Sequence, residues 1–105
     1  MSKYLFLVTV GNIEEGKNIA RNLVENKVAA CVNIIPNITS IYEWKGVIEE
    51  DNEYILFIKT TEEKSALLIQ KIKELHSYDE PECVGFKIES GSQSYLKWIE
   101  DVVGK

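Results

Sequence analysis

The sequence of 105 residues predicts a single α+β domain, and three observations support this class. Residues 28 to 61, VAACVNIIPNITSIYEWKGVIEEDNEYILFIKTT, are dominated by the β-branched and aromatic residues typical of strands. Three other segments space their apolar residues as amphipathic helices do. Two further apolar runs, near residues 3 to 10 and 83 to 89, complete the order β-α-β-β-α-β-α. Residues 1–105 are therefore expected to form one domain with an antiparallel sheet.

Residues 28 to 61 are predicted to form one long β-hairpin that turns at Lys45-Gly46. Glycine tolerates the positive φ that a two-residue hairpin turn needs. With this turn, residues 29–44 form one arm and residues 47–60 the other. A competing turn at Asp51-Asn52 would leave the start of the first arm without an antiparallel partner. Pro36 indicates that the first arm is an edge strand, bulged or bent at that point.

The first and last strands have different patterns. In residues 3–10, KYLFLVTV, apolar side chains fall on both alternating faces, so both faces are expected to be buried. In residues 83–89, Val84, Phe86 and Ile88 are expected to face the core, because Gly85 and Lys87 alternate with them.

Three helices are predicted, over residues 13 to about 26, from the Thr60 cap through residue 75, and over about 93 to 103. The first two each begin with a capping box, in which a polar cap is followed three residues later by glutamate. These pairs are Asn12 with Glu15 and Thr60 with Glu63. Gly91-Ser92 is expected to cap the third helix.

This order of elements is the split βαβ pattern of ferredoxin-like folds, in which right-handed crossovers place both main helices on one sheet face. The other face is then bare, and the short C-terminal helix cannot cover it. Because the first and third strands are apolar on both faces, we expect a homo-oligomer that buries this face and the overhanging hairpin. Tyr42, Trp44, Phe57 and Trp98 are the expected interface residues, and a ligand platform is the alternative role of Tyr42 and Trp44.

Composition and charge argue against several classes of function. The chain has 12 basic and 17 acidic residues, a net charge of −5, and Arg21 as its one arginine, which disfavours nucleic-acid binding. One histidine and no Gly-x-Ser-x-Gly disfavour a catalytic triad, and no residue set suggests turnover. No apolar run reaches the ~20 residues that span a bilayer. We therefore expect a non-enzymatic, cytoplasmic protein without a membrane partner, in which Cys31 and Cys83 are reduced core thiols.

The best candidate site is His76 with Tyr78, Asp79, Glu80 and Glu82 close behind it. Imidazole and carboxylate groups together could bind a divalent metal ion such as copper or zinc. The alternative is a structural histidine at a helix C-terminus, where a positive charge is favourable.

A second candidate is the acidic run of Glu49, Glu50, Asp51 and Glu53 on the second arm of the hairpin. Glu49, Asp51 and Glu53 share one face of this arm. They could bind a cation, or they could simply be a solvated strand surface that resists aggregation. If threefold symmetry brought copies together, either acidic cluster could become a cation site.

Four segments of the sequence resemble the CutA family, the divalent-cation tolerance proteins. They are AACVNIIPNITSIYEWKGVIEEDNEYILFIKT, IARNLVENKVAACVN, LHSYDEPE and GSQSYLKWI, in the order and spacing of that family. The resemblance covers nearly the whole chain. It implies a ferredoxin-like protomer, a tight homotrimer, and a link to tolerance of copper and other divalent cations.

The resemblance also implies metal ligands. His76 matches the histidine that opens the family's usual His-Pro-Tyr segment, and Glu82 matches the glutamate of its Pro-Glu. Ser77 stands where proline is usual. Members with a proposed copper site have a cysteine and a second histidine where Val8 and Leu75 stand, so this chain lacks their thiolate ligand.

Two function hypotheses follow. The first is a trimeric, non-enzymatic protein that binds copper or zinc through His76 and Glu82 in its clefts. The second is a trimeric signalling or scaffold protein similar to the PII proteins, which bind small molecules between subunits, although Lys45-Gly46 closes the hairpin where those proteins have a long mobile loop. An acylphosphatase-like hydrolase ranks last, because no arginine follows the first strand.

Overall fold

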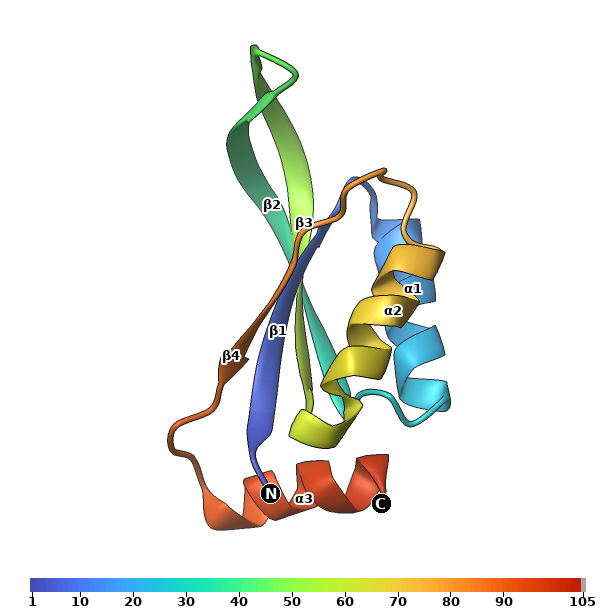
Figure 1. The fold of residues 1–105 in the computed structure, drawn as a ribbon, viewed down its shortest axis with the longest axis vertical. Coiled ribbons are helices and arrows are strands. Elements are labelled where there is room, and N and C mark those ends of the chain that lie inside the picture. The colour runs from blue at the N-terminus through green and yellow to red at the C-terminus, as the bar shows by residue number, and fades with distance from the viewer. Residues whose placement is uncertain (105) are drawn as a thin grey trace.

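The computed structural model describes residues 1–104, which form a four-stranded antiparallel sheet with three α-helices (Figure 1). The elements are, in chain order, β1 (Lys3–Val10), α1 (Ile13–Glu25), β2 (Cys31–Trp44), β3 (Val47–Thr61), the 3₁₀ turn η1 (Glu62–Lys64), α2 (Ser65–Leu75), β4 (Cys83–Lys87) and α3 (Gln93–Val103). The strand order β2-β3-β1-β4 confirms the ferredoxin-like α+β fold. Helices α1 and α2 cover one sheet face, and α3 crosses one end of the sheet (Figure 1).

The hairpin of β2 and β3 turns at Lys45-Gly46, as predicted. These residues have φ angles of 53° and 83°, and two successive positive φ values define the turn that matches the natural twist of a hairpin. The strand pair next to the turn is Trp44 opposite Val47. The register therefore excludes the alternative turn at Asp51-Asn52.

The predicted irregularity at Pro36 is also confirmed. The register between β2 and β3 shifts between Ile35 and Ile38, and Asn37 has a φ of 60°. Proline has no backbone N–H to donate to a ladder, so it is tolerated at a bulge in an edge strand. β2 is an edge strand of this sheet.

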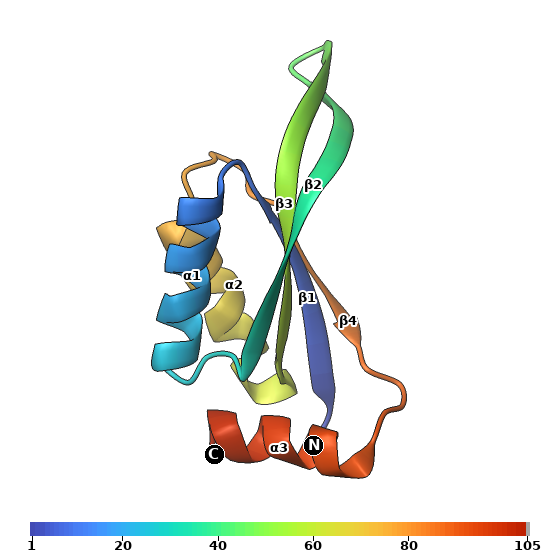
Figure 2. The ribbon, with the colours of Figure 1, turned by 180° about the vertical axis from the view of Figure 1, so that it is seen from behind.

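The outer part of the hairpin extends beyond the rest of the sheet. β1 pairs with β3 from Lys3 opposite Thr61 to Val10 opposite Tyr54, so residues 47–53 pair with β2 alone among the described strands. We call residues 38–53 the overhang. It stands clear of both main helices and gives the molecule its long dimension of 44 Å (Figures 1 and 2).

The core lies between the sheet and helices α1 and α2. Its buried apolar residues come from the sheet, from both helices and from the segment after α1: Phe6, Val8, Val10, Ile19, Leu23, Val28, Ala29, Leu56, Ile58, Leu68 and Ile72. A smaller cluster of Ala30, Ile99 and Val103 attaches α3 to the end of the sheet. No helix formed by residues 1–104 combines the length and hydropathy that crossing a membrane requires.

The predicted orientation of β4 is wrong. Val84 and Phe86 are 45% and 54% exposed, and they lie opposite Leu7 and Leu5 on the sheet face that carries no helix. Gly85 is on the helix side, where an added Cβ would come within 2.7 Å of the Phe6 ring. The strand turns its glycine toward the core because the large Phe6 side chain already occupies that space.

Of the predicted caps, two are present and one is wrong. The side chains of Asn12 and Ser92 accept hydrogen bonds from backbone N–H groups at the starts of α1 and α3. Thr60 caps no helix, because it belongs to β3 and its hydroxyl donates to the Val28 carbonyl at 2.6 Å. The strand runs on through Thr61, and η1 intervenes before α2 begins at Ser65.

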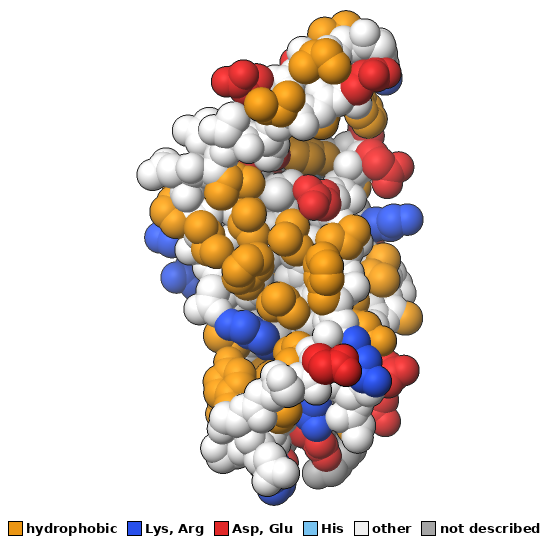
Figure 3. All heavy atoms as spheres, turned by 90° about the vertical axis from the view of Figure 1, so that its left-hand side faces the viewer, with side chains coloured by type: hydrophobic (Ala, Val, Ile, Leu, Met, Phe, Trp, Pro, Cys, Tyr) orange, Lys and Arg blue, Asp and Glu red, His pale blue; other side chains and the backbone are white. Residues whose placement is uncertain are grey.

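The sheet face without helices is apolar and partly exposed. Register places Leu5 and Leu7 of β1 beside Phe57 of β3 and Phe86 of β4 on this face. Both faces of β1 were expected to be buried. Within one chain, only the face toward the helices is buried. Figure 3 shows apolar side chains gathered across the middle of the molecule as seen from the β4 side. We call this surface the open face.

Candidate functional site

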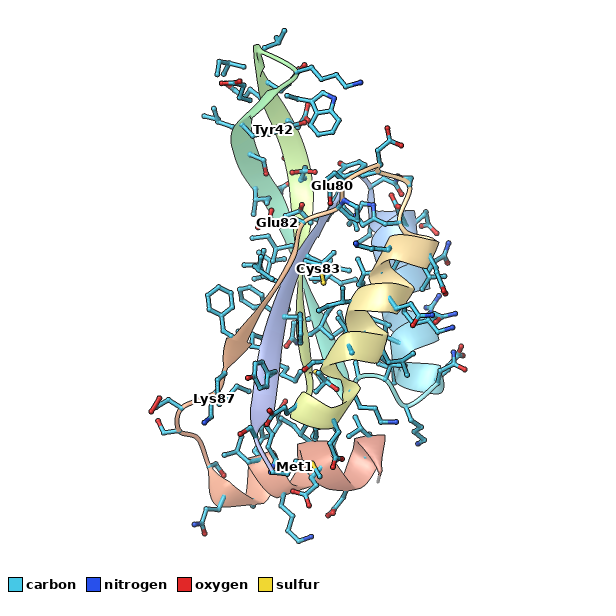
Figure 4. All side chains as sticks on the ribbon, viewed as in Figure 1. Met1, Tyr42, Glu80, Glu82, Cys83 and Lys87 are labelled. Atoms are coloured by element: carbon cyan, nitrogen blue, oxygen red, sulfur yellow. The ribbon has the colours of Figure 1, made fainter. Side chains whose placement is uncertain are left out.

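A pocket of about 560 Å³ lies between the overhang and the loop that joins α2 to β4. Its lining residues are Thr9, Ser40, Ile41, Tyr42, Trp44, Asp51, Glu53, Tyr78, Asp79, Glu80 and Glu82. Figure 4 labels Tyr42 on the overhang, with Glu80 and Glu82 on the loop below it. Two walls of the pocket thus come from segments far apart in the sequence.

The pocket unites the two acidic clusters that the sequence analysis treated separately. Asp51 and Glu53 come from β3, and Asp79, Glu80 and Glu82 come from the loop. The registers explain this meeting, because both segments lie at the same end of β1: Tyr54 of β3 pairs with Val10, and Cys83 of β4 pairs with Val8. Glu49, which shares a strand face with Asp51, is not part of the lining.

Two tyrosine hydroxyls bind the carboxylates of the overhang. Tyr78 donates to Oε2 of Glu53 at 2.6 Å, and Tyr42 donates to Oδ2 of Asp51. The hydrogen bond to Asp51, with a smaller effect of burial, raises the pKa of Tyr42 to about 12. Burial, followed by the hydrogen bond to Glu53, also raises the pKa of Tyr78 well above its usual value. Both phenols therefore remain neutral donors at physiological pH.

His76 follows the last residue of α2, and its side chain is wholly buried. Its Nε2 lies 2.7 Å from the carbonyl oxygen of Thr9, which can only accept, so Nε2 carries the proton. Nδ1 accepts a hydrogen bond from the backbone N–H of Tyr78 at 3.1 Å. Because both ring nitrogens have protein partners, a metal ion at Nδ1 would have to displace the Tyr78 N–H. The geometry supports the structural alternative for His76, and its role as a ligand stays a prediction.

The carboxylate of Glu15 holds the same loop from the start of α1. It accepts from the backbone N–H of Ser77 at 2.7 Å and from the Ser77 hydroxyl at 3.0 Å. Its Oε2 also lies 3.5 Å from Nδ1 of His76. Only half of the expected capping box is therefore present. The backbone N–H of Glu15 donates to the Asn12 side chain, but the Glu15 side chain binds the loop instead of the Asn12 backbone.

The other residues singled out in the sequence have varied positions. Trp44, Tyr42 and Trp98 are between 41% and 43% exposed, and Phe57 is half-buried on the open face, so all four are available to a partner. Cys31 and Cys83 are both free thiols. Burial against the core raises the pKa of Cys83 to about 11, which agrees with an inert thiol.

The pocket is strongly suited to positive charge. It has five carboxylate side chains and no lysine, arginine or histidine in its lining. Among residues 1–104, no three histidine, cysteine or acidic side chains are close enough to form a complete metal site. The carboxylates were predicted as candidate ligands, whereas Tyr42 and Trp44 were predicted to pack against another subunit, with a ligand platform as the alternative, and both line the pocket. The alternation that places Tyr42 and Trp44 on one face of their arm was the available signal.

The fold and this pocket define a ferredoxin-like protein with an acidic cleft beneath an extended hairpin. The family model of the CutA1 divalent ion tolerance proteins matches residues 4–102, so the chain belongs to that family. The resemblance seen in the sequence is therefore confirmed.

Individual relatives agree with this assignment. The divalent-cation tolerance protein CutA of Thermus thermophilus is 44% identical over 98 residues, covering 93% of this chain and 95% of the relative. A CutA homolog of Xenopus laevis is 51% identical over 96 residues, covering 91% of this chain but 64% of the longer relative. A solved structure of the divalent cation tolerance protein from Thermus thermophilus superimposes with a TM-score of 0.94 at 42% identity, covering 97% of this chain and 99% of that one.

Proposed function

We propose that this chain acts as a non-enzymatic homotrimer that binds divalent cations, copper or zinc, in the acidic pocket. The observation that carries the proposal is the set of five carboxylates without a basic side chain in one pocket. Such a pocket concentrates cations, since uncompensated negative charges within low-dielectric walls focus the field. The name of the family, divalent ion tolerance, fits this chemistry.

The trimeric state is supported by the apolar surface that one chain leaves exposed. Phe86 is 54% exposed on the open face, and Ile41 and Ile48 of the overhang are 67% and 68% exposed. Surfaces of this kind mark interaction sites, because exposing contiguous apolar area to water is unfavourable. Trimerisation would also complete the cation site, because a single chain offers no ready group of three ligands within residues 1–104.

Glu82 is our candidate for the principal ligand. It lies in the exposed part of the loop, lines the pocket and is not tied by the hydrogen bonds that hold Glu15 and His76. His76 could join it only by giving up the Tyr78 N–H. The signalling alternative gains no support, since the relatives carry the divalent-cation tolerance name and the hairpin turn is tight. A cytoplasmic location stays a prediction.

The test is calorimetric titration of copper(II) and zinc(II) into metal-free wild type, Glu82→Gln and His76→Ala, with sedimentation of each protein. We expect Glu82→Gln to weaken binding at least about tenfold, the effect of losing about 1.4 kcal/mol of interaction, while the trimer persists. Glu50→Gln is the matched control, because Glu50 is an exposed acid on the same hairpin but outside the pocket.

Each outcome has a distinct meaning. Equal affinities in wild type, Glu82→Gln and Glu50→Gln would show only general attraction to an acidic surface and would refute the proposed site. Unchanged binding in His76→Ala, with secondary structure and assembly retained, would exclude the histidine as a ligand. A monomeric wild type at all concentrations would refute the trimer.

A further inference from the structure

We propose that the acidic pocket also binds a linear polyamine, a chain of methylene groups that carries two or more protonated amines. The inference goes beyond divalent metal binding because it uses the aromatic wall of the pocket, which a small hydrated metal ion does not need. It rests on the size of the pocket, its rings, its buried carboxylate and a cation–π contact already present in the chain.

Size and lining favour an organic cation over a bare ion. A volume of about 560 Å³ lies within the roughly 300–1,000 Å³ range of small-molecule sites. Three aromatic side chains, Tyr42, Trp44 and Tyr78, line it together with the five carboxylates. Their exposed fractions of 41%, 42% and 37% show that the ring surfaces are open to contact. Methylene groups can pack on these rings while the amines reach the acids.

The Trp44 ring already attracts an ammonium group. Nζ of the neighbouring Lys45 lies 5.7 Å from the ring centroid, within the range of a cation–π interaction. Lys45 itself is not among the residues that line the pocket. The contact identifies alkylammonium as a cation that suits this ring.

Glu53 supplies a carboxylate oxygen that is free to accept a further hydrogen bond. The residue is only 5% exposed, and the hydrogen bond from Tyr78 engages Oε2 alone. Among the described residues, only Oε2 has a side-chain partner, and Oε1 is not one of the fully buried atoms that lack a hydrogen bond, so Oε1 is open to a ligand. A buried carboxylate is stabilised by a charge-assisted hydrogen bond, which a primary amine would donate.

The two acidic walls suit a ligand with several separated charges. Asp51 and Glu53 belong to the hairpin, whereas Asp79, Glu80 and Glu82 belong to the loop. A flexible chain with an amine at each end can form ion pairs with the carboxylates of both walls at once, and the aromatic side chains contact its apolar middle. A monoamine could form an ion pair with the carboxylates of one wall only.

The experiment titrates spermidine into the wild-type protein, with putrescine, magnesium chloride and the uncharged 1,4-butanediol as comparison solutes. We expect the affinity to fall from spermidine to putrescine, with magnesium binding more weakly than the diamine of equal charge and butanediol not binding. Trp44→Leu should weaken spermidine about tenfold through the lost cation–π and packing contacts. Asp51→Asn should weaken it without removing a ring, and Glu50→Gln should leave it unchanged.

Metal titrations of the same variants separate this proposal from the proposed function. Trp44→Leu should retain copper or zinc binding, because it removes no carboxylate, whereas Glu82→Gln tests the metal site. Equal binding of magnesium and putrescine, or no effect of Trp44→Leu and Asp51→Asn in a correctly assembled protein, would overturn the polyamine proposal. An intact oligomer that binds no spermidine would also overturn it.

Discussion

The two halves of the long hairpin have similar strand-forming sequences but different surroundings. Near the helices, Leu56 and Ile58 are fully buried beneath α1 and α2. In the overhang, Ile41 and Ile48 are 67% and 68% exposed because no helix extends over them. The comparison teaches that β-branched residues favour a strand in both places, whereas their contribution to stability depends on what covers the strand.

The same two halves differ in their use of polar groups. In the helix-covered half, the buried hydroxyl of Thr60 donates a hydrogen bond to the carbonyl of Val28, 32 residues earlier in the chain. In the overhang, Asp51 and Glu53 point their carboxylates at tyrosines around a pocket. The covered half therefore contributes the buried core, and the overhang contributes one wall of the acidic pocket.

The largest expected effect comes from Leu56→Ala in the covered half. Leu56 is 0% exposed, so its truncation leaves a cavity and should lower the free energy of unfolding by about 2–5 kcal/mol. Urea unfolding should show this loss at every protein concentration. Ile48→Ala in the overhang is the contrast, because its effect should depend on assembly and hence on concentration. A loss below about 1 kcal/mol for Leu56→Ala would contradict the assigned core.

A smaller effect is expected for Phe86→Ala on the open face. If assembly buries this ring, its removal costs roughly 1.5–3 kcal/mol per protomer of the assembled state. Sedimentation over a dilution series should show the variant dissociating at higher concentration than wild type. Lys87→Ala, at the next position of the same strand but on its other face, is the control. An unchanged dissociation profile for Phe86→Ala would exclude the open face from the interface.

The smallest effect concerns the pH dependence of the overhang. The pKa of Tyr42 is raised to about 12 from an ordinary value of 10, chiefly by its hydrogen bond to Asp51. The stability that this bond contributes is therefore complete below pH 10 and is lost as the pH rises through 12. Tyrosinate absorbance should show Asp51→Asn lowering the pKa of Tyr42 toward 10, and Glu50→Gln should not. Equal titration curves for the two variants would disprove the coupling.

Much of the fold could be predicted from local patterns. Lys45-Gly46 identified the turn, Pro36 the bulge and Asn12 the first cap, because each depends on backbone geometry within a few residues. Thr60 failed as a cap because the pairing of β3 with β1 continues through Thr61, and a capping pattern does not reveal where a strand ends.

The candidate site was predicted only in its parts. Glu82 and the acids of the hairpin stood out as candidate ligands, but their shared pocket depends on the registers of β3 and β4 with β1. His76 also stood out, yet its two ring partners come from Thr9 and Tyr78, of which the first is distant in sequence. Spacing alone could not distinguish a ligand from a residue that holds a loop.

The sequence by itself determined the elements, their order and the length of the hairpin, because hydrophobic period and turn chemistry act over short distances. The tertiary structure decided which side of β4 faces the core, since the Phe6 ring leaves room only for Gly85. It also decided that acids from two separate segments surround one pocket with Tyr42 and Trp44. Both outcomes depend on which residues of neighbouring strands lie opposite each other, and that register is set by packing between segments rather than within them.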